Sequence, residues 1–338
     1  MPVCNGAAQQ FAACGEIGDK GQRRMKIIVI GAGASLEQSI RLGVDKALRS
    51  PLIGNFGATL WTSNLALPQS LHEYMARYLR ECGQEPGLNA VTTFVRLEVL
   101  ANAKINVERF FEFAWAHRNE SYSGAWGDLI YGAVVNVLVD LFARNGFFEN
   151  GVGWKPLNAY QALAKKLDPG DLVVNLNYEP LFEMGAMQAG CKLAYVPNVA
   201  QPGEFLVAKP HGSINLIVEK DKFWFSEPDI IGSQMAPGEH MDQFRGIVPP
   251  RYGKSFDQHP VAVRIFEAIR DYRPESVTFW GVGFTSSDAD LTKAYEGWCS
   301  SASKISLVHP SPTTEVADAE RMLKRGIQHF SQPEDWDY

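Results

Sequence analysis

The chain predicts an α/β protein: a Rossmann-like, mainly parallel sheet with helices on both faces and a helical insertion. Two observations carry this prediction. A short apolar strand, Lys26 to Ile30, runs directly into Gly31-Ala-Gly33, and a second strand, Val277 to Trp280, runs into Gly281-Val-Gly283. Around them, short apolar runs alternate with amphipathic segments, as they do in strand–helix–strand units.

Composition narrows the class of protein. The chain has 338 residues, of which 46% are hydrophobic and 21% charged, and its net charge is −6. A net negative charge argues against nucleic acid as a direct partner, because binding a phosphate backbone needs a cationic face. No apolar run reaches the roughly 18 residues of a membrane span, so no membrane partner is expected.

Cysteine usage points to a reducing compartment. The five cysteines are scattered without C-x-x-C spacing, which disfavours a zinc ribbon and a disulfide framework. We therefore expect a cytoplasmic protein that holds no metal. H-E-x-x-H and G-x-S-x-G are also missing from the sequence, so metalloprotease and serine-hydrolase chemistry are disfavoured.

Pattern changes along the chain predict its organisation. Residues 1–24 are rich in Gly, Ala and Gln and are expected to be a disordered leader. Met25 opens directly into the first strand, which suggests that translation starts there; a native mass beginning at Met1 would reject this. Residues 25–64 and 150–330 are assigned to the Rossmann-like domain, 65–149 to the helical insertion with its 3.6-residue apolar period, and 331–338 to a tail.

The remaining elements follow from the same patterns. Helices are expected at Glu37–Leu48, Leu157–Leu167, Pro180–Gln188 and Pro260–Tyr272, after Asp288 as far as Cys299, and at Val316–Lys324. Strands are expected at Leu172–Leu176, Lys192–Val196, Glu204–Lys209, Ile214–Val218 and Ile305–Val308. Helices connect most of these strands along the chain, and this alternation predicts one parallel sheet.

The first glycine loop has the composition of a phosphate cradle. Its small residues would let a pyrophosphate approach the main chain, and N–H groups at the following helix start would bind it, with Ser35 as N-cap. The residues predicted to do this are Gly31, Ala32, Gly33, Ala34 and Ser35. Leu36 stands where a dinucleotide fingerprint has its third glycine, and no strand ending in an acid follows about 20 residues on. A dehydrogenase is therefore disfavoured.

The second glycine loop repeats this logic. Gly281 and Gly283 follow a strand, and Ser287 and Asp288 could cap the next helix. Ordinary turn chemistry would explain either loop alone. Two such loops in one α/β chain favour a dinucleotide or an ADP-ribose ligand.

Two polar side chains are candidates for chemistry. Asn177 lies just beyond a buried strand, where an amide suits ribose hydroxyls, although a turn-forming asparagine is the alternative. His211 is held between Pro210 and Gly212 and could act as a base, with a purely structural histidine as the alternative. Loops 31–35, 175–179, 210–213 and 281–288 all follow strands, so we expect them to converge at one crevice.

These motifs, in this order, resemble the sirtuin-like family of NAD-consuming domains, in particular its zinc-free bacterial branch. The resemblance covers about residues 26–310. It is carried by Gly31-Ala-Gly-Ala-Ser35, Asn177-Tyr-Glu179, Lys209-Pro-His-Gly-Ser213, Val248-Pro-Pro250 with Lys254, and Gly281-Val-Gly-Phe-Thr-Ser-Ser-Asp288. It implies an NAD site with the first glycine loop and Ser35 at the phosphates, Asn177 near the nicotinamide ribose, His211 as the catalytic base and the second glycine loop beside the adenosine.

The chain departs from that family at several positions. Glu179 stands where Asp is usual, and His309-Pro310 where Asn-Pro is common. We keep Glu179, Gly212, Ser213 and His309 as expected nucleotide contacts. The four zinc-binding cysteines of protein-deacylating members have no counterpart here, which disfavours peptide deacylation.

The resulting expectation is an NAD glycohydrolase that forms nicotinamide and ADP-ribose. Asn177 would orient ribose and water, and His211 would accept the proton. The resemblance further implies a regulated defence effector that acts as a homo-oligomer or with a partner protein. The alternatives are a non-catalytic sensor of NAD or ADP-ribose, and a protein deacylase or ADP-ribosyl transferase.

Overall fold

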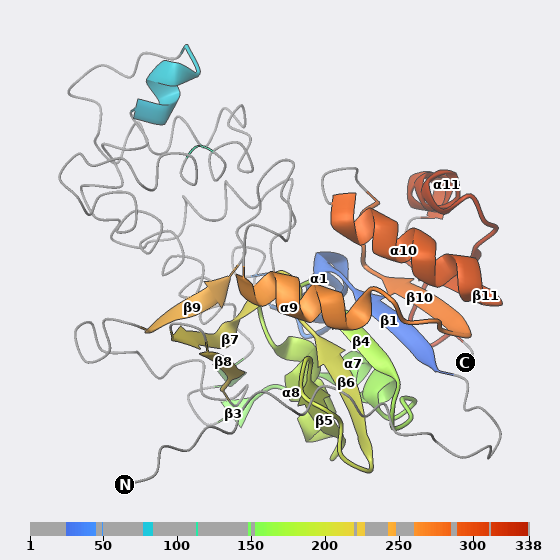
Figure 1. Ribbon diagram of the computed structural model, residues 1–338. Coiled ribbons are helices and arrows are strands. Elements are labelled where there is room, and N and C mark those ends of the chain that lie inside the picture. Colours follow the sequence, from blue (N-terminus) through green and yellow to red (C-terminus); the bar gives the residue numbers. More distant parts are fainter. Residues whose placement is uncertain are drawn as a thin grey trace, which may run out of the picture.

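Figure 1 shows a computed structural model of the chain. The structure describes residues 25–44, 49, 77–83, 113, 148–149, 153–219, 222–226, 243–247, 260–284, 289–310 and 312–336. The predicted leader at 1–24, most of the predicted insertion at 65–149, and both Ser287 and Asp288 lie outside these ranges.

A seven-stranded parallel sheet organises the described part of the chain, which confirms the predicted fold class. Its strand order is β12-β11-β10-β1-β4-β6-β5. The strands are β1 (Lys26–Ile30), β4 (Leu172–Asn175), β5 (Lys192–Tyr195), β6 (Glu204–Ala208), β10 (Ser276–Trp280), β11 (Lys304–Val308) and β12 (Gln328–Phe330).

The central strand is β1, which pairs with β10 on one side and with β4 on the other. All of Ile27 to Ile30 are fully buried, as expected of a strand covered on both faces. From β1 the chain builds β4, β5 and β6 on one side and then returns to place β10 on the other. The strand order thus reverses beside β1, and in open α/β sheets ligands bind at the carboxyl ends next to such a reversal.

Helices cover both faces of the sheet (Figure 1). One face carries α1 (Ala32–Arg41), α7 (Asn158–Ala164) and α8 (Leu181–Gln188), and the other α9 (Pro260–Ile269), α10 (Ala289–Ser301) and α11 (Pro312–Leu323). The alternation of side chains along each strand divides the core accordingly. Ile27 and Val29 pack with α9 to α11, whereas Ile28 and Ile30 pack with α1, α7 and α8.

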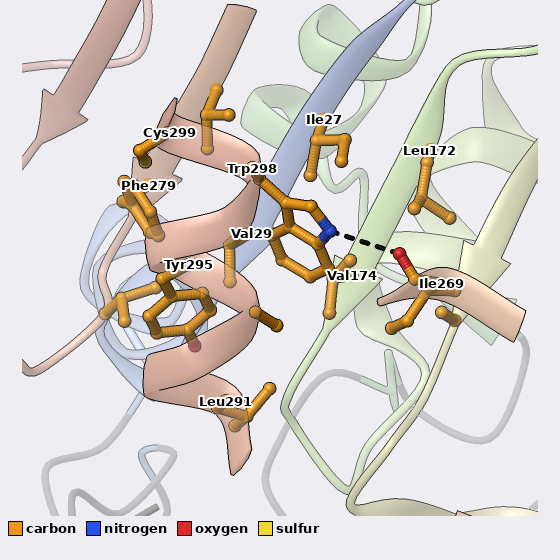
Figure 2. Close-up of a cluster of buried hydrophobic side chains, with 14 of the residues drawn as sticks. Ile27, Val29, Leu172, Val174, Ile269, Phe279, Leu291, Tyr295, Trp298 and Cys299 are labelled. Atoms are coloured by element: carbon orange, nitrogen blue, oxygen red, sulfur yellow. Dashed lines mark hydrogen bonds between the residues drawn. The ribbon is translucent and has the colours of Figure 1, made fainter. Parts of the chain in front are cut away.

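Trp298 on α10 anchors the first of these cores (Figure 2). Its indole is fully buried beside Ile27, Val29 and Val174, and its Nε1 donates a hydrogen bond of 3.1 Å to the carbonyl oxygen of Ile269. One side chain therefore fills space over β1 and β4 and also fixes α10 to the end of α9.

The second core includes the C-terminal segment that the sequence had suggested as a tail. Trp336 is 3% exposed and belongs to the same cluster as Tyr160, Phe182 and Trp280. Its carbonyl oxygen accepts a hydrogen bond of 3.1 Å from Lys166 Nζ. Trp336 and Pro333 thus connect this segment to the domain, while its other residues are exposed.

Two small antiparallel sheets complete the described structure. The first contains β2 (Phe148–Glu149) and β3 (Gly153–Trp154); the second has the order β8-β7-β9, with β7 (Gly212–Glu219), β8 (Lys222–Phe225) and β9 (Gln243–Ile247). The strand predicted at Ile214–Val218 is part of β7 and belongs to this second sheet, not to the parallel one. No helix in the described ranges has both the length and the apolar character to cross a bilayer.

The start of α1 differs from the prediction. We expected Ser35 to be the N-cap of a helix over Glu37–Leu48, but α1 begins at Ala32 with Gly31 as its N-cap and ends at Arg41. Gly31 has extended backbone angles, so the chain enters the helix directly from β1. Ser35 therefore lies inside α1, where its side chain faces the core.

Candidate functional site

The loops predicted to converge follow four neighbouring strands, β10, β1, β4 and β6, at the same edge of the sheet. Hydrogen bonds connect them. Asn177 Nδ2 after β4 donates to the carbonyl oxygen of Gly31 after β1 at 3.1 Å, and Gly33 N–H donates to the carbonyl oxygen of Gly281 after β10 at 2.9 Å. The structure thus brings these loops together as expected.

The glycine bends pack against each other backbone to backbone. A Cβ on Gly31 would lie 2.5 Å from Gly281 O, and a Cβ on Gly281 would lie 2.1 Å from Ala34 N. Gly281 also has φ +63°, which disfavours other residues. Close approach of the two loops is therefore sufficient to explain these glycines, without a ligand.

The same packing uses main-chain donors that we predicted to be free for phosphate. Gly31 N–H donates to Trp280 O at 2.9 Å, Gly33 N–H to Gly281 O, and Ala34 N–H to Gly31 O at 3.0 Å. For these three amides the prediction of free donors is wrong, because the end of β10, the second glycine loop and the first turn of α1 supply their acceptors. Ala32, Gly33 and Gly281 remain half-buried and Gly283 is exposed, so the outer side of the bend still reaches solvent.

Ser35 is the centre of a buried hydrogen-bond cluster, which we call the Ser35 node. Its Oγ lies 2.8 Å from Tyr160 Oη, 3.0 Å from Asn177 Nδ2 and in a short hydrogen bond with Glu179 Oε1. All four side chains are at most 6% exposed. The node joins α1, α7 and the loop after β4.

Glu179 is the ionisable member of the Ser35 node. Burial raises its pKa to about 7, while the charge of Lys209 and the hydrogen bond from Ser35 act in the opposite direction. We expected Glu179 as a nucleotide contact; its Oε1 is instead directed at Ser35. The carboxyl group consequently changes charge within the neutral pH range.

A buried ion pair lies beside the node. Lys209, at the end of β6, and Glu183, on α8, are both 0% exposed, and Lys209 Nζ lies 3.0 Å from Glu183 Oε1. Lys209 also donates to the carbonyl oxygen of Glu179 at 3.0 Å, and Asn175 Nδ2 donates to both oxygens of Glu183. The pair holds the loop after β4 against β6 and α8.

His211 follows β6 and is tied to the same loop. Its Nδ1 lies 3.1 Å from the carbonyl oxygen of Leu176, the residue before Asn177. A carbonyl oxygen can only accept, so Nδ1 carries the hydrogen and Nε2 is the basic nitrogen of the neutral ring. Gly212, with φ +74°, makes the turn that follows, and its N–H donates to Lys209 O at 2.8 Å.

The other predicted contacts are used within the protein. Ser213 Oγ lies 2.9 Å from Tyr178 O and 2.5 Å from Asn215 Oδ1, so its hydroxyl connects β7 to the loop after β4. His309 follows β11, beside β10, and its Nδ1 lies 4.0 Å from Glu315 Oε2. His309 is therefore one strand farther from Asn177 than the second glycine loop, which follows β10.

Three residues of this region escaped the sequence analysis as site residues: Tyr160, Glu183 and Lys209. A usable signal existed for two of them, because a Lys directly after the strand Glu204–Ala208 and a Glu inside the apolar segment Leu181–Gln188 predict a buried pair. Tyr160 gave no such signal, since tyrosine is common in amphipathic helices.

With the geometry established, the chain was compared with known proteins: it matches no family model and no curated protein. Among the described residues no group of His, Cys, Asp or Glu side chains is arranged to hold a metal ion.

Proposed function

We propose that this protein is an NAD hydrolase, which cleaves the bond between nicotinamide and ribose and forms nicotinamide and ADP-ribose. The observation that carries the proposal is the hydrogen bond between His211 and the backbone of the loop that carries Asn177. The ring is bonded to the carbonyl group of Leu176, the adjoining residue, at the carboxyl edge next to the strand reversal. The residue proposed as the base is thus bonded to the loop that carries the amide proposed to bind ribose, at the edge where α/β sheets bind nucleotides.

The reaction does not need a strong acid from the protein. Nicotinamide leaves as a neutral molecule, and the ribose passes through an oxocarbenium-like state that water then attacks. A base must take the proton from water or from a ribose hydroxyl. The Nε2 of His211 suits this role, because an imidazole nitrogen without a hydrogen can accept a proton and the tautomer is set by Leu176.

Asn177 supports the proposal through its remaining acceptor. Both hydrogens of its amide are used, one by Gly31 O and one by Ser35 Oγ. Its Oδ1 is then the atom that would accept a hydrogen bond from a ribose hydroxyl, and the two donated bonds fix its direction. The half-buried outer side of the bend at Ala32 and Gly33 would face the phosphates.

Control of the activity is part of the proposal. Free NAD hydrolysis would harm the host cell, so we propose a cytoplasmic defence effector that acts in an oligomer or together with a partner protein. Full activity in a dilute monomer would contradict this part of the proposal.

A second candidate is a non-catalytic sensor of NAD or ADP-ribose. The observation that favours it is the engagement of the Gly31 amide by Trp280 O in β10 and of the Gly33 amide by Gly281 O, together with the inward direction of the Glu179 carboxyl group. Such a protein would bind ADP-ribose and release no nicotinamide.

The test is incubation with NAD followed by chromatography of the products. The hydrolase proposal predicts that the wild-type protein releases nicotinamide and ADP-ribose and that His211→Ala abolishes the release. The matched control is His329→Gln, because His329 belongs to edge strand β12 and contacts the main chain at His309 O. Binding of ADP-ribose without nicotinamide release would support the sensor, and nicotinamide release only with an acylated peptide would indicate a deacylase.

A further inference from the structure

We infer that Tyr160 is a positioning residue of this site: through Ser35 Oγ it fixes the Asn177 amide and the Glu179 carboxyl group. The inference rests on the proposed function, for which it names a further residue. Tyr160 lies on α7 and is fully buried, with its hydroxyl at the carboxyl edge of the sheet.

The Tyr160 ring is held rigidly. Its centroid lies 5.2 Å from that of Trp280 and 5.9 Å from that of Phe182. On α8, Gly185 gives Tyr160 room, since a Cβ at Gly185 would lie 2.5 Å from the Cβ of Tyr160. Aromatic neighbours and a close helix contact thus surround the ring, and the hydroxyl lies 2.8 Å from Ser35 Oγ.

Counting donors and acceptors assigns the direction of each hydrogen bond in the Ser35 node. A serine hydroxyl has one hydrogen and two lone pairs. The amide of Asn177 can only donate through Nδ2, and ionised Glu179 can only accept. The Ser35 hydrogen therefore goes to Glu179, and its second lone pair accepts from Tyr160. With Glu179 ionised, all groups are satisfied only in this arrangement.

Removing the Tyr160 hydroxyl would disturb this arrangement. Ser35 would lose the donor that occupies its second lone pair, and cooperative strengthening of its bond to Glu179 would be lost. The weaker bond would stabilise ionised Glu179 less, and the Asn177 amide would be held less firmly. Charged or titratable groups also face Glu179 from other elements: Lys209 after β6 and Glu183 on α8. Tyr160→Phe leaves both unchanged.

The expected effects separate positioning from mere packing. Tyr160→Phe keeps the ring and should keep the fold. We expect kcat for nicotinamide release to fall about five- to tenfold with KM nearly constant, since the amide orients the reacting ribose. We also expect Glu179 to titrate at higher pH by about 0.5 or more, because its ionised form loses support.

The test combines both readouts on the full chain. Infrared difference spectroscopy of the protein without NAD follows protonation of Glu179, with Glu179→Gln to assign the signal. The control is Tyr195→Phe, on edge strand β5. It removes the hydroxyl of a half-buried tyrosine, which is bonded to Asn215 Nδ2 at 3.2 Å. It should leave the Glu179 titration in place.

An unchanged Glu179 titration in folded Tyr160→Phe would overturn the inference. If that variant did not fold, Ser35→Ala would serve, with a larger shift to higher pH expected and an unchanged titration again decisive against it. The spectroscopic readout needs no turnover, so a wild-type protein that released no nicotinamide would refute the proposed function and leave this test intact.

Discussion

Replacing Lys209 with Met would leave a buried carboxylate without its counter-ion. Lys209 and Glu183 are both fully buried at an Nζ–Oε1 distance of 3.0 Å, and the Lys209 ammonium also bonds Glu179 O. Removing one partner of a buried pair costs about 3 to 5 kcal/mol. At about 2 to 4 °C per kcal/mol for a domain of this class, the melting temperature should fall by about 6 to 20 °C.

Urea unfolding followed by tryptophan fluorescence would measure the loss of unfolding free energy. Lys26→Met is the matched control, because Lys26 Nζ lies 3.9 Å from Asp168 Oδ2 in a partly exposed pair, for which we expect less than about 1 kcal/mol. The double variant Lys209→Met/Glu183→Gln should recover most of the lost stability, since no isolated charge remains buried. A loss in Lys209→Met no larger than in Lys26→Met would refute the reasoning.

Three further predictions concern particular residues. Because the pKa of Glu179 is raised to about 7, its ionisation destabilises the fold. Relative to wild type, Glu179→Gln should therefore gain about 3 kcal/mol of unfolding free energy as the pH rises from about 4.5 to above 7. A difference between the two proteins that did not change with pH in urea unfolding would contradict this. Gly281→Ala should lower the melting temperature sharply, because the φ of Gly281 is +63° and a Cβ there would lie 2.1 Å from a main-chain nitrogen. Gly283→Ala should change it little, because no described atom beyond the chain neighbours lies within 4 Å of a Cβ at that position. Equal effects of the two variants in thermal unfolding would contradict the close packing of the two glycine loops. Trp298→Ala should cost about 3 to 5 kcal/mol in urea unfolding, and a cost below about 1 kcal/mol would show that the core around it is not closely packed.

Local sequence was enough to predict the parallel sheet. A strand buried on both faces is a nearly continuous apolar run. Residues 27–30 are such a run in the sequence itself, and residues 277–280 have Thr278 as their one polar residue. The glycines after them also predicted where the loops would meet. These properties depend on the residue and its immediate neighbours, so they are readable without tertiary information.

The site's interior was not predictable in the same way. Ser35 was expected as an N-cap, yet it bonds Tyr160 and Glu179, which are 125 and 144 positions away in the chain. The beginning of α1 depends on how Gly31 and Gly281 pack together, which is a contact between distant segments. Pairings of this kind are fixed by the fold, and no local pattern encodes them.

The location of a bound nucleotide tests the central claim most directly. Hydrogen–deuterium exchange of the full chain with saturating ADP-ribose would show which backbone segments the ligand protects. The account predicts protection of the segments at 31–35, 175–179 and 209–213, which follow β1, β4 and β6. Binding with protection confined to other segments, or no binding of ADP-ribose or NAD, would contradict it.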